Sequence, residues 1–291
     1  LFIQNYLDID PTEKYQDQNC GNLSYDGHKG TDFRLRDIVA MKKGVDVIAV
    51  ADGTVAGVRD SEPDIHYKKL PKGAVEGKEC GNGVVMEHDG LWETQYCHLM
   101  KGSIIVERGQ KLKKGDVIGK VGLSGQTEFP HVHLSIRHDG ETVDPFIGRE
   151  LPTTCKDIRD PLWDTEVSDQ LAYIDTAILN VHFTDKVPKI EQAREGKYRK
   201  EVISRSASAI IAWVEFFGLL KGDKIIIKIT KPDGGVLVRD SKIVPKNKAV
   251  FFQYAGKKIR ADLTAGTYVA HISLERQGKT KLEAKKTVKV K

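Results

Sequence analysis

Short runs in which apolar and polar residues alternate recur along the chain, and turns rich in glycine, proline and aspartate separate them. Alternation with a period of two is typical of strands that bury one face. Residues 81–88 and 92–99 are two such runs, and Asp89-Gly90 between them predicts a hairpin. The pattern predicts an all-β chain.

The second half contains seven of these runs at nearly even spacing. They cover residues 174–183, 209–217, 224–230, 236–243, 249–254, 266–274 and 281–290. Even spacing of short strands, with turn signals between them, is typical of a β-sandwich of the immunoglobulin-like kind, and the pattern requires no helix. A fold alone does not define a function, so we expect a binding or spacing module here.

A polar stretch with two prolines, residues 151–163, predicts a linker. We therefore expect a first domain over 1–150 and an accessory sandwich over 164–291. Charge changes at the same place: residues 151–291 contain 27 Lys and Arg against 17 Asp and Glu, a net charge of +10. Residues 1–150 contain 19 basic and 24 acidic residues, a net charge of −5. The two parts therefore present different surfaces.

Composition is that of an ordinary globular protein, with 291 residues of which 40% are hydrophobic. The longest apolar stretch, 207–220, is interrupted by Ser208, Glu215 and Gly218 and is shorter than a membrane span. The chain starts at Leu1 without a charged and then apolar leader. This start is expected of a mature form from which a signal peptide has been removed.

Four cysteines, Cys20, Cys80, Cys97 and Cys155, lack the Cys-x-x-Cys spacing of thiolate metal sites and redox motifs. Disulfides are the better interpretation. The predicted hairpin brings Cys97 almost opposite Cys80, with one bulge needed for alignment, and Cys20 and Cys155 remain as the second pair. Two disulfides indicate an oxidising compartment, either the periplasm or the exterior of the cell.

Two histidines one residue apart, His131 and His133, follow Pro130 and a loop-like stretch. On a strand their side chains share a face. About a hundred residues earlier, His28 and Asp32 lie in a glycine-containing turn region. A single histidine is more often a packed or solvated residue than a ligand, but imidazole and carboxylate groups together suit zinc. A set of this kind with one open coordination position is typical of catalytic zinc sites, so the chain is interpreted as a metallohydrolase.

A third histidine, His98, lies at the end of the predicted strand 92–99, at the rim of the sheet. Its neighbour Cys97 is expected to point to the opposite face, because successive side chains of a strand alternate. A structural role for Cys97 is therefore favoured over a nucleophile or a metal ligand.

Three motifs then occur in a fixed order: His-x-x-x-Asp at 28–32, Tyr-x-His-Leu at 96–99, and Ser-Gly-x-Thr-x-x-Pro-His-x-His at 124–133. Together with the glycine-punctuated runs 47–55 and 109–122, they resemble the lysostaphin/LytM-type zinc metallopeptidases over about residues 20–146. The resemblance implies that His28, Asp32 and His133 bind one zinc ion. It also implies that His98 and His131 are catalytic, and it leaves open which of them is the general base. An insertion over 59–80 departs from the family pattern and is expected to form a wall of the cleft.

The resemblance implies a zinc-dependent endopeptidase that hydrolyses the peptide cross-links of bacterial peptidoglycan. We favour the bond between D-alanine and a diamino acid over glycyl-glycine bonds. The alternative is a non-catalytic module of the same fold that binds the cell wall or activates an amidase. The complete ligand set argues against this alternative, because degenerate members of the family have lost ligands.

The basic second half raises the question of nucleic acid. Its basic residues are scattered through strands and turns, without a helix-turn-helix, zinc-finger or base-stacking motif. The expected partners are therefore peptidoglycan peptide and, through the basic domain, anionic polymers of the envelope. Nucleic acid and a transmembrane segment are not expected.

Overall fold

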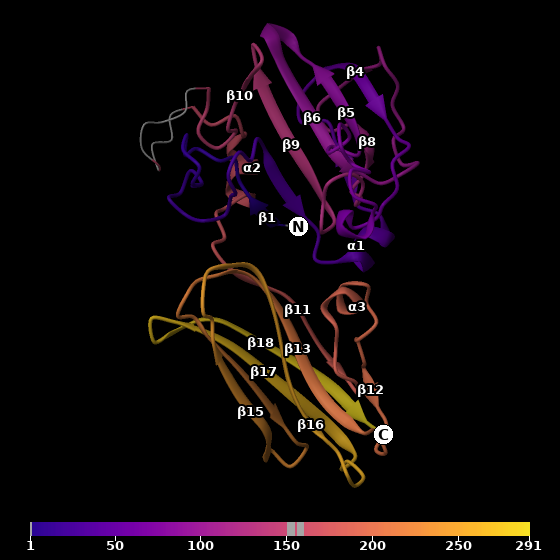
Figure 1. The fold of residues 1–291 in the computed structure, drawn as a ribbon, viewed down its shortest axis with the longest axis vertical. Coiled ribbons are helices and arrows are strands. Elements are labelled where there is room, and N and C mark those ends of the chain that lie inside the picture. Colours follow the sequence, from indigo (N-terminus) through magenta and orange to yellow (C-terminus); the bar gives the residue numbers. More distant parts are fainter. Residues whose placement is uncertain (1, 150–154, 156–159) are drawn as a thin grey trace. The chain divides into compact units, whose positions relative to one another are not determined.

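The computed structural model describes residues 2–149, 155 and 160–291, which form two compact units, Leu1–Ile174 and Asp175–Lys291 (Figure 1). Strands dominate both units, as the sequence predicts. The division falls after the predicted boundary near residue 164, because helix α2 (Thr165–Gln170) belongs to the first unit. Residues 151–154 and 156–159 of the predicted linker lie outside the described residues, so the linker stays a prediction.

The first unit is organised around one large sheet with the strand order β1-β2-β9-β6-β5-β4-β7, and β10 pairs with β9. Strands β3 and β8 form a separate two-stranded sheet. The elements are β1 (Phe2–Asn5), β2 (Thr31–Arg34), α1 (Ile38–Lys43), β3 (Asp46–Ile48), β4 (Gly53–Arg59), the 3-10 helix η1 (Tyr67–Lys69), β5 (Asn82–Glu87), η2 (Asp89–Leu91), β6 (Trp92–Leu99), β7 (Lys111–Leu112), β8 (Val117–Lys120), β9 (His131–His138) and β10 (Glu141–Thr142).

Strand β9 shows why the sheet has two different faces. Its alternate residues Val132, Leu134 and Ile136 are buried in the apolar core of the unit. The residues between them, including His133 and Ser135, therefore point to the other face. Strand β9 lies between β2 and β6 (Figure 1), so both neighbours can contribute side chains to that face.

Both predicted disulfides are present in this unit. Cys80 and Cys97 are bonded with their Cα atoms 4.8 Å apart, and the β5–β6 pairing that aligns them shifts register between Asn82 and Val84. Cys20 and Cys155 are also bonded, across 135 residues of sequence. Cys97 is consequently neither a thiol nucleophile nor a metal ligand.

The second unit consists of a three-stranded sheet, β11-β13-β16, and a five-stranded sheet, β12-β18-β17-β14-β15. Both sheets contribute to one apolar core. The elements are β11 (Ala177–Thr184), α3 (Ile190–Arg194), β12 (Val202–Ile203), β13 (Ala209–Leu219), β14 (Lys224–Thr230), β15 (Val236–Ile243), β16 (Lys248–Lys258), β17 (Gly266–Arg276) and β18 (Lys279–Val290). Each of the seven predicted strands corresponds to one of these. The immunoglobulin-like class stays a prediction, which this division of strands between two sheets supports.

The expectation that the second unit has no helix is wrong, and strand β13 explains why. All eleven residues of β13 are buried, so both of its faces are covered. On the face away from the core, Arg194 at the end of α3 donates to the Glu215 carboxylate over 2.7 Å. The Trp213 indole likewise donates to the Tyr198 carbonyl over 2.6 Å. A buried carboxylate and indole need such partners, and the 190–198 segment supplies them.

Within the described residues, no helix is long and apolar enough to cross a membrane.

Candidate metal centre

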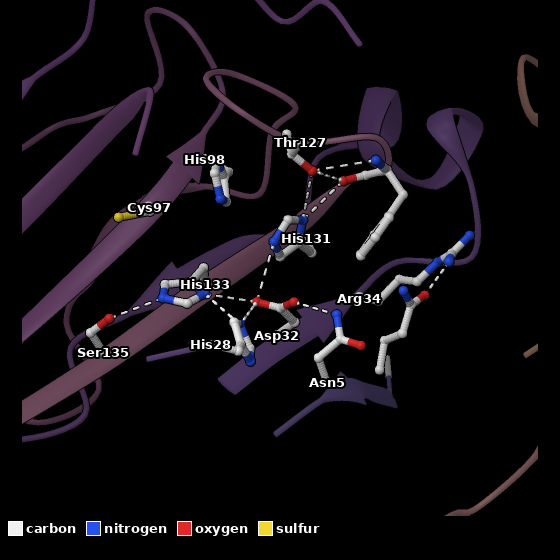
Figure 2. Close-up of polar contacts among 12 residues, drawn as sticks. Asn5, His28, Asp32, Arg34, Cys97, His98, Thr127, His131, His133 and Ser135 are labelled. Atoms are coloured by element: carbon white, nitrogen blue, oxygen red, sulfur yellow. Dashed lines mark hydrogen bonds and ion pairs between the residues drawn. The ribbon is translucent and has the colours of Figure 1, made fainter. Parts of the chain in front are cut away.

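The pairing of β2 with β9 brings the predicted site residues together. Asp32 is directly opposite His133, and Arg34 is directly opposite His131. Directly opposite residues of an antiparallel pair share a face, so Asp32, His131 and His133 line one side of the sheet. His28 approaches from the turn before β2, and His98 from the end of β6 (Figure 2).

Three atoms form a compact group of possible metal ligands. The Nδ1 atom of His133 lies 2.8 Å from Oδ1 of Asp32 and 3.1 Å from Nε2 of His28. The remaining separation, from Nε2 of His28 to Oδ1 of Asp32, is 3.2 Å. A tetrahedral zinc ion with ligands at about 2.0–2.1 Å holds its donor atoms roughly 3.3 Å apart. The spacing and the donor set therefore fit one zinc ion.

Hydrogen bonds fix the tautomers of the two histidines in this group. Nδ1 of His28 lies 2.7 Å from the Tyr6 carbonyl and must donate to it, so Nε2 keeps its lone pair. The Ser135 hydroxyl donates to the Lys29 carbonyl over 2.9 Å, and it therefore accepts from Nε2 of His133 over 3.0 Å. This leaves the lone pair of His133 on Nδ1. Each histidine thus directs a nitrogen with a free lone pair to the centre. The Tyr6 carbonyl and the Ser135 hydroxyl orient the two rings, as hydrogen-bond partners behind metal ligands commonly do.

Asp32 is oriented in the same way. Its Oδ2 atom accepts a hydrogen bond of 2.7 Å from the Asn5 amide, so Oδ1 faces the histidines. Burial by itself would raise the pKa of the Asp32 carboxyl, but the imidazoles of His28 and His131 hold this pKa well below its ordinary value. Asp32 is therefore ionised at neutral pH, as a carboxylate ligand must be.

Gly30 allows the turn that carries His28 to pass next to His133. A Cβ atom on Gly30 would lie 2.6 Å from Nε2 of His133 and 2.6 Å from the Leu134 carbonyl oxygen. Contacts this short do not occur, so a side chain at position 30 would displace the backbone or the imidazole. Gly30 is thus required by the close approach of two chain segments.

His131 and His98 form a second pair beside the three ligand candidates, with ring centroids 4.6 Å apart. Nδ1 of His131 donates to the Phe129 carbonyl over 2.9 Å, which leaves a lone pair on Nε2. This Nε2 atom lies 3.4 Å from Oδ1 of Asp32. Nδ1 of His98 donates to the Ser124 carbonyl over 2.8 Å, so its lone pair is also on Nε2.

The electrostatic environment keeps His98 neutral. Burial, reinforced by the neighbouring imidazoles of His131 and His133, lowers the pKa of His98 well below its ordinary value. The backbone of His98 has φ of 63°, in the left-handed region that a bulky residue rarely adopts. Such strain is common at functional sites. Cys97 is directly opposite His133 and therefore shares its face, and the left-handed backbone of His98 turns the next side chain to the same face, beside His131. The expectation that Cys97 points to the face opposite His98 is therefore wrong.

The insertion 59–80 packs against the loop that leads into β9. The Tyr67 amide donates to the Thr127 carbonyl over 3.0 Å. The Thr127 hydroxyl in turn lies 3.1 Å from Nδ1 of His131. The insertion therefore supports a loop that contacts a site histidine, and its last residue is held by the disulfide to β6.

All five predicted site residues are thus brought into one place, while four supporting residues were not predicted. Asn5 ends strand β1 and Tyr6 follows it, and Thr127 and Ser135 lie on either side of the His131/His133 pair. Ser135 could have been found from the alternation of β9, because it shares the face of His133. Nothing in the local sequence marks Asn5 or Tyr6, since the β1–β2 pairing places Asn5 opposite Asp32 and a backbone hydrogen bond to Leu23 holds Tyr6.

The segment that contains this site matches a known protein family. Residues 26–145 match the model of peptidase family M23, and this segment contains all five site residues. The segment is an M23 peptidase domain of the LytM type. M23 proteins are metallopeptidases, and the His28, Asp32 and His133 group of this M23 domain is a possible metal site.

Curated relatives match less than half of the chain. An uncharacterised metalloprotease of Haemophilus influenzae is 33% identical over 127 residues, which are 44% of this chain and 22% of that protein. The peptidoglycan DD-endopeptidase ShyB of Vibrio cholerae is 33% identical over 117 residues, covering 40% of this chain and 22% of that protein. The DD-carboxypeptidase/endopeptidase Mpg of Neisseria meningitidis is 32% identical, covering 43% and 23%. The matched region spans less than a quarter of each of these relatives.

Solved structures give partial superpositions. The catalytic domain of the antimicrobial peptidase lysostaphin from Staphylococcus simulans is 23% identical, with a TM-score of 0.31 over 41% of this chain and 77% of that one. A zinc-containing peptidase from Vibrio cholerae is 25% identical, with a TM-score of 0.32 over 52% of this chain and 40% of that one.

Proposed function

We propose that the chain is a zinc-dependent endopeptidase that hydrolyses peptide cross-links of bacterial peptidoglycan. The observation that carries the proposal is the convergence of two sets of groups: His28, Asp32 and His133 as zinc ligands, and His98 and His131 beside them. The names of the relatives ShyB and Mpg support peptidoglycan as the substrate class.

The ligand group supplies two neutral nitrogens and one carboxylate, which together leave a fourth coordination position for water or substrate. When bound there, zinc supplies a water of lowered pKa and polarises the carbonyl of the scissile amide. Asn5, Tyr6 and Ser135 keep the ligand atoms oriented through their hydrogen bonds. These partners reduce the reorganisation needed when metal binds.

His98 and His131 provide the proton transfers. Amide hydrolysis requires one proton to leave the attacking water, one to reach the departing amine, and a donor to stabilise the oxyanion. Both imidazoles have Nδ1 committed to a backbone carbonyl and Nε2 available. Either can accept the proton of the water at Nε2 and later donate it. The roles of general base and oxyanion donor are not assigned individually to His98 or His131.

For the scissile bond we favour D-alanyl–diamino acid over glycyl-glycine, because the relatives ShyB and Mpg carry DD-endopeptidase names. The compartment we propose is the periplasm or the cell exterior. Two disulfides in the first unit support this location, because reducing compartments disfavour them.

Digestion of purified, cross-linked peptidoglycan tests the proposal, with fragments identified by mass spectrometry. The proposal predicts that dimeric muropeptides fall to monomers with a new D-alanine carboxyl terminus. Cleavage of glycine bridges with survival of these dimers would overturn the choice of bond. If no fragment is released while metal is bound, the chain is instead a non-catalytic binder or amidase activator of the same fold.

A further inference from the structure

The strand register of the second unit places four basic side chains in one line across the five-stranded sheet. Arg239 on β15 is directly opposite Lys228 on β14. Lys228 is directly opposite His271 on β17, and His271 is directly opposite Lys285 on β18. We name these four residues the basic row. Directly opposite residues share a face, and neighbouring strands are about 4.8 Å apart, so the row is roughly 14–15 Å long.

The row lies on the face of the sheet away from the core. On β14 the residues on either side of Lys228, Ile227 and Ile229, are buried in the apolar core. Lys228 therefore points outward, and its row partners Arg239 and Lys285 are exposed. The row crosses four of the five strands, with Arg239 and Lys285 exposed at its ends and Lys228 and His271 half-buried between them.

Ion pairs within the chain do not neutralise the row. Across the described residues, Lys228, Arg239 and Lys285 have no acidic side chain within salt-bridge distance, whereas the neighbouring Lys224 pairs with Glu275 over 3.3 Å. The pKa of His271 reflects these charges. Burial, and then the charges of Lys228 and Lys285, lower this pKa, whereas the Glu283 carboxylate raises it. The potential over the row is therefore positive.

Folding stability does not account for such an arrangement. Like charges directly opposite each other on neighbouring strands are destabilising. Lysines on edge strands can protect a sheet from edge-to-edge pairing, which would explain Arg239 on β15. This protection does not apply to Lys228, because β14 is an interior strand. Three cations, Arg239, Lys228 and Lys285, stand in one line that crosses an interior strand without an acidic partner, which points to an anionic ligand.

The surroundings of the row define the kind of ligand. The flanking positions on one side are Ile226, Ser273 and Glu283, and those on the other are Thr230, Val269 and Thr287. They contain no aromatic side chain on which a nucleobase could stack. The cationic surface is one residue wide, which suits a linear polyanion better than a flat anionic membrane.

We propose that the basic row binds the free carboxylates of peptidoglycan stem peptides and thereby holds the M23 domain on its polymeric substrate. This inference rests on the proposed function, because that function makes peptidoglycan the anionic polymer that the chain meets. The row acts by charge and contributes no catalytic group.

Pelleting of the full-length protein with purified sacculi tests the proposal. A His98→Ala background keeps the polymer intact during the measurement. The row variant carries Lys228→Gln, Arg239→Gln and Lys285→Gln. The matched control carries Lys246→Gln, Lys257→Gln and Lys258→Gln, which remove the same charge from exposed positions outside the row. Binding to sacculi whose carboxylates have been amidated, to anionic vesicles and to duplex DNA is measured in parallel.

The row variant is expected to lose about tenfold or more of its sacculus affinity at low salt, while the control stays within about twofold of the parent. Amidated sacculi should bind the parent as weakly as untreated sacculi bind the row variant. Equal binding by row variant and parent overturns the proposal, as does undiminished binding to amidated sacculi or preferential binding to vesicles or DNA. Thermal melting of the variants establishes folding, and Lys228→Gln alone, with a smaller loss expected, serves if the triple variant unfolds.

The same substitutions made without His98→Ala separate this inference from the proposed function. Cleavage of small, soluble dimeric muropeptides should be equal in the row variant and the unaltered protein. If neither cuts the dimers, the proposed function fails while the binding result still stands. A row variant that folds but loses this cleavage would show that the row serves the active site, contrary to the proposal.

Discussion

The two units differ in what fills their interiors. Of the buried polar and charged residues in the described chain, 18 lie in the first unit and 5 in the second. Both disulfides also lie in the first unit. Burying polar groups costs stability unless partners satisfy them, whereas the apolar core of the sandwich is stabilised directly by burial. The first unit therefore carries the larger cost of buried polar groups, and its two disulfides offset part of that cost.

The largest expected effect is confined to the first unit. Asp32→Ala removes the charged ligand, so bound zinc and peptidase activity should both be lost, while the sandwich remains folded. Metal analysis and muropeptide cleavage measure the two losses. Asp26→Ala, an exposed carboxylate in the same turn region, is the matched control and should keep both properties. Full zinc occupancy in Asp32→Ala would contradict the ligand assignment.

His98→Ala and His131→Ala are expected to lower the rate by about a hundred- to ten-thousand-fold with zinc still bound, the usual range for positioned acid–base groups. Steady-state kinetics together with metal analysis check this expectation. His138→Ala, on the same strand as His131, is the control and should retain a rate near that of the unaltered protein. A near-normal rate in His98→Ala would exclude it from the proton transfers.

Removal of metal should destabilise one unit and not the other. A ligand present at 100 to 1,000 times its Kd stabilises the folded state by about 3–4 kcal/mol. Calorimetry with and without chelator is therefore expected to show one transition that moves to lower temperature and another that does not. Movement of both transitions would show that the units unfold together.

The disulfide between Cys80 and Cys97 offers a smaller change within the first unit. The cysteines are 17 residues apart, and closing a loop of this size is worth about 3 kcal/mol in the chain-entropy model. Replacing both cysteines by serine should lower the first transition by a comparable or smaller free energy and leave the sandwich unaffected. An unchanged first transition in the double-serine protein would show that the cross-link contributes nothing measurable.

The smallest expected effect concerns Asp144. Burial and then the Asp17 carboxylate raise the pKa of Asp144 to about 6, against an ordinary value of 3.8. The folded state therefore binds a proton that the unfolded state has released, so this group's contribution to stability falls as pH rises from about 4 to 6. Asp144→Asn should remove this fall, by an amount on the order of 2–3 kcal/mol. Parallel denaturation curves of both proteins at pH 4 and pH 7 measure it, and identical pH dependence would contradict the shift.

Sequence and structure agree best where local pattern decides the outcome. The seven strands of the sandwich follow from period-two alternation, and the Cys80–Cys97 bond follows from the turn at Asp89-Gly90. Strand β12 was missed because a strand of two residues has no periodicity. Helix α3 was missed because it is short and its position depends on contacts with a face of β13 that is distant in sequence.

The site shows the same limit. The four histidines and one carboxylate of the candidate site stand in ordered motifs, so they could be predicted one by one. Their supporting hydrogen bonds could not, since Asn5 reaches Asp32 across 27 residues and Ser135 reaches the Lys29 carbonyl across 106. Such contacts depend on strand pairing over long sequence separation, which local pattern does not encode.

The most direct test of the central claim is a zinc titration of the metal-free, full-length protein with a purified dimeric muropeptide as substrate. The account predicts no cleavage without metal, a rate that rises to its maximum at one zinc per chain, and no recovery in Asp32→Ala. Cleavage by the metal-free protein, or zinc bound at this centre with the dimer left intact, would contradict it.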